Sequence, residues 1–202
     1  MDINKTKIKM VVDTREKSHK HITDVWDKGI KIYPSQHEKK EGKKAYYTKP
    51  IQYFKQEKGL KTGDFTICVQ LPSGEQINFK DKIVIERKAS LAELVGNLND
   101  TKSMDQEGLN RFERELKRSA DLGIKMIVLV EVGGGYSKAN MGIFRHDVLS
   151  KMRPLSYQAK IFSLKARYGF ELVYLDKRDS AKYIYEELYY FAREYLKNIE
   201  GN

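Results

Sequence analysis

A nearly continuous run of apolar residues in the second half of the chain constrains the fold most strongly. Between residues 124 and 132, only Lys125 and Glu131 interrupt the apolar sequence. A strand of this composition is typical of a sheet that helices cover on both faces, because neither face of the strand then meets water. The run therefore predicts an α/β fold with this strand inside a central sheet.

Segments with strand and helix periodicity alternate along the chain. Predicted strands cover residues 8–12, 64–69, 82–88, 124–132 and 170–175, and predicted helices cover residues 19–28, 90–98, 107–121, 154–168 and a last segment after Asp179. The turn residues at 72–74 indicate an antiparallel hairpin between residues 64–69 and 82–88. A chain of 202 residues suits one domain. We therefore expect a single domain over residues 1–202, with a central mixed β-sheet flanked by α-helices on both faces.

Charge and cysteine content narrow the class of partner. The chain has 38 Lys and Arg against 28 Asp and Glu, a net charge of +10, which favours a polyanion as partner. The longest apolar stretch, residues 126–130, is far below the roughly 20 residues of a membrane helix, so we expect no membrane partner. The single cysteine, Cys68, excludes an internal disulfide and indicates a reducing compartment. We expect an intracellular protein, cytoplasmic if its source is bacterial or viral, with a nuclear location left open.

Two carboxylates and a lysine stand out on the predicted hairpin. Residues i and i+2 of a strand share a face, so Glu86 and Lys88 lie side by side while Arg87 faces away. Asp64, at the start of the partner strand, is placed across from Glu86. Two converging carboxylates repel each other, which raises a pKa or recruits a cation. Magnesium suits such a pair because it prefers hard oxygen ligands and keeps several waters.

This combination suits hydrolysis of a phosphodiester. One or two metal ions held by Asp and Glu stabilise the charged transition state and lower the pKa of the attacking water. Lys88 would then orient or deprotonate that water, or neutralise the scissile phosphate.

Three short motifs carry a family resemblance. Val-Asp-Thr-Arg-Glu at 12–16, Gly-Asp-Phe at 63–65 and Val-Ile-Glu-Arg-Lys at 84–88 resemble, in order and strand context, the nuclease domain of the XPF family of structure-specific DNA endonucleases. The resemblance continues through residues 90–98 and the helix around Arg111 to about Leu196. It implies a restriction-endonuclease-like fold. It also implies a Mg²⁺-dependent endonuclease, with Mn²⁺ as a substitute, that cuts branched, flap or fork DNA in repair, recombination or replication.

The resemblance also implies roles for individual residues. Asp64 and Glu86 would bind the metal, with Asp13 as a further metal-binding carboxylate, and Lys88 would act on water or phosphate. Arg15, Glu16 and Arg87 would orient the ligands, bind phosphate or stabilise the fold. For Arg87, a structural salt bridge under a helix remains an alternative to a phosphate contact, because its side chain faces away from Glu86.

The sequence departs from the family pattern after the third motif. Family members carry an Asp where this chain has Ala92, and Glu93 follows. Glu93 either replaces that catalytic carboxylate or caps the helix that Ser90 opens. We also expect no tandem helix-hairpin-helix module of the kind that usually follows the nuclease domain. DNA would then be positioned by a homodimer, by another protein or by a part of this chain.

A basic insertion at about residues 34–62 is the part of the chain best suited to that task. It interleaves lysines with tyrosines, which pairs charges for the phosphate backbone with rings on which unpaired bases stack. The alternative is that the insertion is a solvated loop without a binding role. The candidate DNA contacts in the insertion are Lys43, Lys44, Tyr46 and Tyr47. Arg111, on the predicted helix over 107–121, is a further candidate, and the alternative for it is an exposed salt-bridged helix face.

A second class of function remains open. A chain of this fold with an impaired active site would bind DNA as a scaffold or support an active partner subunit. Scaffold paralogues normally lose the carboxylate of Glu-Arg-Lys or of Gly-Asp, and both are present here as Glu86 and Asp64. The enzyme is therefore the favoured interpretation.

Overall fold

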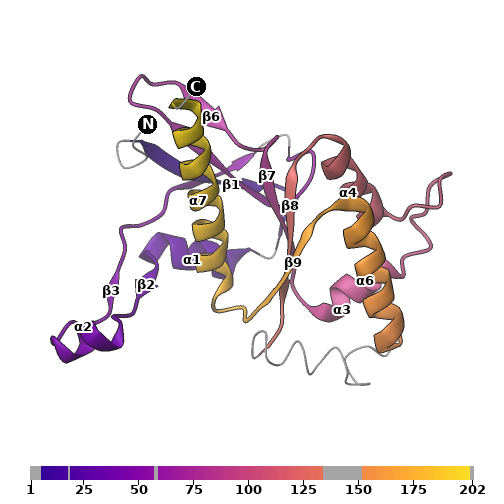
Figure 1. Cartoon of the computed structure of the whole chain (residues 1–202), viewed down its shortest axis with the longest axis horizontal. Coiled ribbons are helices and arrows are strands. Elements are labelled where there is room, and N and C mark those ends of the chain that lie inside the picture. The colour runs from indigo at the N-terminus through magenta and orange to yellow at the C-terminus, as the bar shows by residue number, and fades with distance from the viewer. Residues whose placement is uncertain (1–5, 18, 57–58, 134–151, 201–202) are drawn as a thin grey trace.

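A seven-stranded mixed sheet forms the centre of the molecule (Figure 1). The computed structural model describes residues 6–17, 19–56, 59–133 and 152–200. The strands of this sheet are β1 (Lys7–Asp13), β4 (Tyr53–Gln56), β5 (Phe65–Gln70), β6 (Gln76–Asn78), β7 (Ile83–Lys88), β8 (Lys125–Glu131) and β9 (Glu171–Leu175). Their order is β4-β1-β5-β7-β8-β9, with β6 paired to β5. Strands β7, β8 and β9 are mutually parallel, whereas β5 is antiparallel to both β1 and β7.

Helices cover both faces of the sheet, as the apolar strand predicts. The helices are α1 (Lys20–Lys28), α2 (Gln36–Lys40), α3 (Leu91–Leu98), α4 (Arg111–Asp121), α6 (Pro154–Tyr168) and α7 (Ser180–Glu200). On β8, Ile127 and Leu129 pack in one core with α1 and α7, while Val128 and Val130 pack in the other with α3, α4 and α6. The predicted fold class, a mixed sheet between two helical layers, is confirmed. None of the described helices is long and apolar enough to cross a membrane.

The predicted hairpin is wrong in its connection. The turn after β5 leads into β6, with Cys68 opposite Asn78, and β7 follows only after a further loop. β5 and β7 pair at a single position, Phe65 opposite Ile85. A strand of three residues carries too little alternation to be recognised. The helix predicted over 107–121 likewise begins only at Arg111, because Asn110 forms a capping box that fixes its start.

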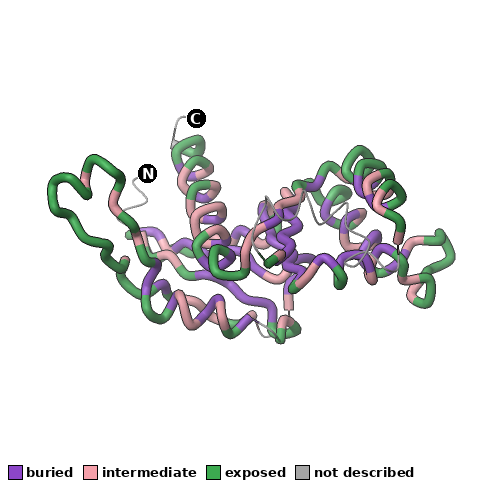
Figure 2. The backbone as a smooth tube through the Cα atoms, turned by 90° about the horizontal axis from the view of Figure 1, so that it is seen from below, coloured by how far each residue is buried: buried purple, intermediate pink, exposed green. Residues whose placement is uncertain are grey.

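The basic insertion predicted at about residues 34–62 divides into two parts in the structure. Its later part contributes β4 to the central sheet, where Tyr53 lies opposite Met10 of β1, and residues 57–58 lie outside the described residues. Its earlier part joins the three residues before it in an arm, residues 31–47, built from β2 (Lys31–Ile32), α2 and β3 (Tyr46–Tyr47). Figure 1 shows the arm extending away from the sheet, on the side opposite to α3, α4 and α6. Most of the arm is exposed (Figure 2).

The arm is joined to the body by a close backbone approach. Gly29 has φ of 83°, and a Cβ atom there would lie 2.1 Å from the carbonyl oxygen of Thr48. The amide of Thr48 donates to the carbonyl of Ile30 (2.9 Å), and the Ile30 amide donates to Thr48 Oγ1 (2.9 Å). A residue with a side chain cannot replace this glycine without opening the junction.

Candidate active site

The junction of β5 and β7 brings Asp64 and Glu86 together, as predicted. The amide of Asp64 donates to the carbonyl of Ile85 (2.8 Å), and the amide of Arg87 donates to Asp64 Oδ2 (2.8 Å). Gly63 makes this approach feasible, because it has φ of 74° and a Cβ there would lie 2.7 Å from Cβ of Val84. The Gly-Asp motif therefore places the Asp64 carboxylate beside β7, and a residue with a side chain in place of Gly63 would clash with Val84.

The two carboxylates open into a cleft of about 260 Å³. It lies between β7, the start of β5, the segment after β1, and helices α3 and α4. The charged residues that line it are Arg15, Glu16, Asp64, Glu86, Arg87, Lys88, Glu93, Asp100, Arg111 and Glu115. The structure thus gathers most of the predicted catalytic residues in one place.

Burial and like charge act on both carboxylates. Burial raises the pKa of Asp64 well above its usual range, and the charge of Glu86 raises it further. Burial also raises the pKa of Glu86, although the neighbouring Lys88 opposes this shift. The pair is therefore short of compensating positive charge, which is the condition that recruits a cation.

Lys88 lies on the same face as Glu86, as strand periodicity predicts. Its Nζ atom is 2.6 Å from Glu86 Oε1 and 5.0 Å from the centre of the Phe112 ring. Burial would lower the pKa of Lys88, but the charge and hydrogen bond of Glu86 raise it above its ordinary value. The contacts of Lys88 therefore favour its charged form.

Asp64 and Glu86 fit a magnesium ion as its protein ligands. Mg²⁺ is commonly bound by one or two carboxylates, with water and substrate phosphate completing its shell. Among the described residues, no cluster of three or more His, Cys, Asp or Glu side chains could hold a metal. A pair of carboxylates that repel each other thus suits this ion, whereas a fully protein-built metal cage does not occur in the described part of the chain.

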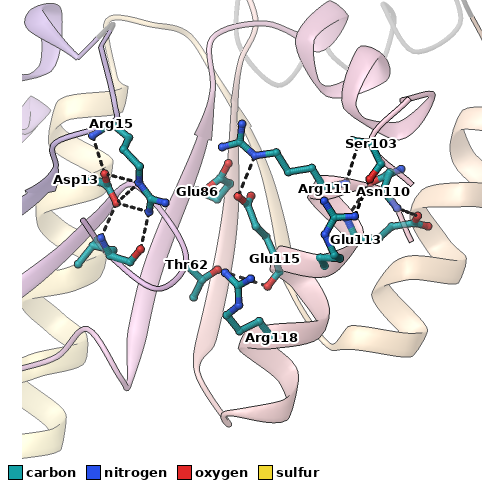
Figure 3. A network of polar contacts seen from close by, with 12 residues as sticks. Asp13, Arg15, Thr62, Glu86, Ser103, Asn110, Arg111, Glu113, Glu115 and Arg118 are labelled. Carbon is teal, nitrogen blue, oxygen red and sulfur yellow. Dashed lines mark hydrogen bonds and ion pairs between the residues drawn. The ribbon is translucent and has the colours of Figure 1, made fainter. Parts of the chain in front are cut away.

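Asp13, predicted as a further metal ligand, does not line the cleft. Its Oδ1 accepts from the amide of Arg15 (2.7 Å), and its Oδ2 accepts from Arg15 Nη2 (2.7 Å) and from the amide of Leu60 (2.6 Å). Burial alone would raise the pKa of Asp13, but these hydrogen bonds lower it. Asp13 anchors Arg15, whose side chain remains 63% exposed at the rim of the cleft. Figure 3 shows the two side chains locked together.

Arg87 forms the structural salt bridge that the sequence offers as an alternative to a phosphate contact. Its guanidinium donates to both oxygens of Glu131, through Nε (2.9 Å) and Nη2 (2.8 Å), and pairs with Glu16 at 3.2 Å. His21 of α1 contacts the same Glu131 (2.7 Å). The Arg87 side chain is only 2% exposed, so it ties β7, β8 and α1 together under the site. Glu16 both belongs to this network and lines the cleft.

Glu131 and His21 were missed by the sequence prediction. A lone carboxylate that interrupts the apolar strand of residues 124–132 was the available signal for Glu131. A charged residue is almost never fully buried unless it is paired, so it required a cationic partner. Nothing local in the sequence indicates His21.

Glu93 lies in the first turn of α3, whose N-cap is Ser90. Its amide donates to Oγ of Ser90 (3.1 Å), and its Oε2 accepts from the amide of Ala89 (2.8 Å). Glu93 also lines the cleft. Glu93 therefore takes part in the hydrogen bonds at the start of α3, and its place in the lining of the cleft leaves its predicted catalytic role a prediction.

Helix α4 forms the opposite wall of the cleft. Arg111 lies at its start with a 73% exposed side chain, 3.5 Å from Glu115, and Figure 3 shows both reaching toward Glu86. Glu115 was not predicted, and its charge contributes to the raised pKa of Glu86. Arg118 Nη1 donates to the carbonyl of Lys61 (2.6 Å), which ties α4 to the loop that precedes Asp64.

The predicted DNA contacts of the insertion lie on the arm, outside the cleft. Lys43, Lys44, Tyr46 and Tyr47 are exposed. Lys43 is within 3.5 Å of both Glu38 and Glu41, so part of its charge is compensated. Tyr46 and Tyr47 are neighbours in a strand and point to opposite faces.

Comparison with known proteins agrees with this geometry. The family model of the ERCC4 domain matches residues 12–186. The solved structure of XPF from Aeropyrum pernix is similar over 96% of this chain and 69% of its own, with 18% sequence identity and a TM-score of 0.52. XPF from Aeropyrum pernix in complex with DNA is similar over 92% of this chain and 65% of its own, with 19% identity and a TM-score of 0.51.

These likenesses establish the type of fold. They confirm the predicted restriction-endonuclease-like architecture. The chain spans about two thirds of the length of these structures. A search of curated protein sequences finds no match.

Proposed function

Since the chain belongs to the ERCC4 domain family, we propose that it is a metal-dependent DNA endonuclease that hydrolyses phosphodiester bonds in the cleft of Asp64 and Glu86. One observation carries the proposal. Two buried carboxylates converge in a cleft without enough positive charge to compensate them, and the ammonium of Lys88 lies beside them. Structural ion pairs balance their charges, whereas a site that binds a cation and a phosphate leaves them unbalanced.

Each residue of the cleft has a role in this proposal. Asp64 and Glu86 hold Mg²⁺, or Mn²⁺ in its place, and a bound ion would stabilise the charged transition state and lower the pKa of the attacking water. Its carboxylate neighbour favours the charged form of Lys88, which supports a role in neutralising the scissile phosphate rather than in accepting a proton. Arg15 and Arg111, exposed on two sides of the cleft, contact the flanking phosphates.

The substrate in this proposal is branched, flap or fork DNA that contains a junction of duplex and single strand. The cleft takes the scissile phosphate, and Lys43, Lys44, Tyr46 and Tyr47 of the arm contact a more distant part of the DNA. A second copy of the chain or a different protein subunit completes the positioning. The process served is DNA repair, recombination or replication.

The test is cleavage of end-labelled flap, fork, nicked duplex, plain duplex, single-stranded DNA and RNA, in Mg²⁺ or in EDTA. Wild type is compared with Asp64→Asn, which keeps the acceptor for the Arg87 amide but removes the charge. The matched control is Asp121→Asn, an exposed carboxylate at the end of α4 whose partner is Lys117.

We expect Mg²⁺-dependent cuts near the branch point that Asp64→Asn abolishes and Asp121→Asn retains. Tight binding of forked DNA with no cut in either Mg²⁺ or Mn²⁺ would instead identify a scaffold of the same fold. Cleavage that persists in Asp64→Asn would place the chemistry elsewhere in the molecule.

A further inference from the structure

A second groove lies where the arm meets the start of α7. It has a volume of about 460 Å³. The residues that matter for its chemistry are Lys28, Lys31, Tyr33, Tyr47, Arg178 and Lys182. None of them lines the cleft of Asp64 and Glu86. The groove is therefore a separate surface built from the arm, the end of α1 and the beginning of α7.

Strand register places two tyrosines around one lysine in this groove. Lys31 of β2 lies opposite Tyr47 of β3, so the two share a face of the small sheet. Tyr33 follows Lys31 by two residues and lies on the same side. The Lys31 Nζ atom is 5.1 Å from the centre of the Tyr33 ring and 5.9 Å from that of Tyr47. Tyr33 is 69% exposed and Tyr47 is 58% exposed.

The groove carries a surplus of positive charge. Four basic residues line it against one acidic residue, Asp179. Within the described part of the chain, neither Lys28 nor Lys31 forms an ion pair with a carboxylate. Arg178 is bound by Asp176, and Lys182 lies 3.8 Å from Glu186. The uncompensated charge is therefore concentrated on Lys28 and Lys31, beside the exposed rings.

Exposed aromatic rings next to uncompensated lysines suit an anion that also carries flat rings to stack on them. We propose that this groove binds a single-stranded segment of DNA, with its bases stacked on Tyr33 and Tyr47 and its phosphates contacted by Lys28, Lys31 and Lys182. Base stacking on aromatic side chains tolerates any sequence, and a basic groove follows the backbone. Duplex DNA keeps its base faces stacked internally, so the tyrosines discriminate against it. The choice of DNA as the nucleic acid rests on the proposed function.

This inference revises the predicted contacts of the arm. Tyr47 belongs to the groove, whereas Tyr46 lies opposite Ile32 on the other face of the small sheet. Tyr33 and Lys31, which precede the predicted contacts in the sequence, replace Tyr46 and Lys43 in the single-strand site.

The test measures binding rather than cleavage. The full chain in EDTA is titrated into a fluorescein-labelled oligo(dT) of about 12 nucleotides, within the usual site size of single-strand binders, and into a blunt duplex of equal length. We expect Tyr33→Ala/Tyr47→Ala to weaken oligo(dT) binding about tenfold or more. Tyr33→Phe/Tyr47→Phe should retain the affinity, because the ring and not the hydroxyl stacks.

Two controls separate stacking from loss of fold or of general charge. Tyr190→Ala removes an exposed tyrosine of α7 that contacts Arg193 and should leave binding unchanged. Lys31→Gln should reduce the slope of log K against log salt by about 0.7, the value for one single-strand phosphate contact.

Other outcomes overturn the inference. Unchanged oligo(dT) affinity in the double alanine variant would do so, as would an equal loss for oligo(dT) and duplex. Binding to phosphatidylserine vesicles in place of oligo(dT) would identify the groove as a membrane-surface site. If forked DNA is cut while the tyrosines do not affect oligo(dT) binding, the inference fails alone. If the tyrosines control oligo(dT) binding but no substrate is cut, the proposed nuclease activity fails alone.

Discussion

The cleft of Asp64 and Glu86 and the groove at the arm differ in the sign of their excess charge. Four basic and six acidic residues line the cleft, whereas four basic residues and one acidic residue line the groove. The overall charge of +10 attracts a polyanion, yet the cleft itself does not supply that attraction. A site that needs a cation for its chemistry is short of positive charge, and long-range attraction must come from another surface.

The two regions also differ in how their side chains are held. At and below the cleft, buried hydrogen bonds hold several charged groups, as Glu131 does for Arg87 and Glu86 does for Lys88. In the groove, the rings and lysines are exposed and contact mainly one another. Substitutions in the cleft should therefore change catalysis or stability strongly, whereas substitutions in the arm should change binding and leave the fold intact.

Asp64→Asn is expected to give the largest effect and to separate the two regions completely. Cleavage of forked DNA should fall by about a thousandfold or more, the scale of loss when an essential catalytic group is removed. Oligo(dT) binding should stay unchanged, because Asp64 is not in the groove. Gel assays and fluorescence anisotropy measure the two quantities on the same preparation.

The same variant should be at least as stable as wild type in EDTA. Burial and the charge of Glu86 raise the pKa of Asp64 in the folded state, so ionised Asp64 destabilises the fold as pH rises through its unfolded pKa toward the raised folded value. Asparagine removes that charge and keeps an acceptor for the Arg87 amide. Urea unfolding at pH 5 and pH 8 should show a gain for Asp64→Asn that grows with pH. A loss of stability at pH 8 would make the Asp64 carboxylate structural.

Glu131→Gln tests whether buried pairs hold the cleft from below. Removing one partner of a buried ion pair typically costs about 3–5 kcal/mol, because the other charge stays buried without compensation. Arg87 retains Glu16 as a second partner, so we expect about 3 kcal/mol, measured by urea unfolding. Glu171→Gln is the matched control, since Glu171 pairs with Lys125 at the surface and should cost less than about 1 kcal/mol. Equal losses in the two variants would contradict the distinction between held and exposed charges.

The sequence predicts the parts of the site that lie within one strand or one motif. Glu86 and Lys88 share a face because strands alternate, and the Gly-Asp motif places Asp64 next to them. The surroundings of Asp13 could be predicted only in part, because its hydrogen-bond partners lie at different distances along the chain. Arg15 lies two residues away, but the amide of Leu60 belongs to a loop that only the fold brings near. Glu131 reaches Arg87 across 44 residues of sequence, and no local pattern encodes that pairing.

The fold shows the same division between local and distant determinants. The long apolar strand and the helices with clear stripes are located to within a few residues. β4 was not recognised, because its four residues, Tyr-Phe-Lys-Gln, show no alternation and its pairing with β1 depends on the sheet edge that β1 offers. Weak strands of this kind are determined by their neighbours more than by their own propensity.

Asp13→Asn should show how an anchored rim residue depends on pH. Hydrogen bonds from Arg15 and Leu60 lower the pKa of Asp13 in the folded state. A lowered folded pKa stabilises the fold above the unfolded pKa, about 3.9 for Asp, and this contribution is lost as pH falls through the folded pKa. At pH 7 the variant should lose about 1.5–3 kcal/mol, the worth of hydrogen bonds to a charged group. The deficit should shrink below about pH 4 and be smaller throughout in an Arg15→Gln background.

The smallest effects are expected for Lys43→Gln/Lys44→Gln in the arm. Both residues are exposed, so the free energy of unfolding should change by less than about 0.5 kcal/mol. Lys43 is already compensated by Glu38 and Glu41, whereas no ion pair of Lys44 is found among the described residues. The double variant should therefore reduce the salt slope of forked-DNA binding by about one contact, roughly 0.7–0.9, and not by two. Lys44→Gln alone should reproduce most of that change. A reduction of the salt slope by two contacts would show that DNA displaces Glu38 and Glu41 from Lys43. An unchanged salt slope would confine DNA binding in the arm to the groove around Lys31.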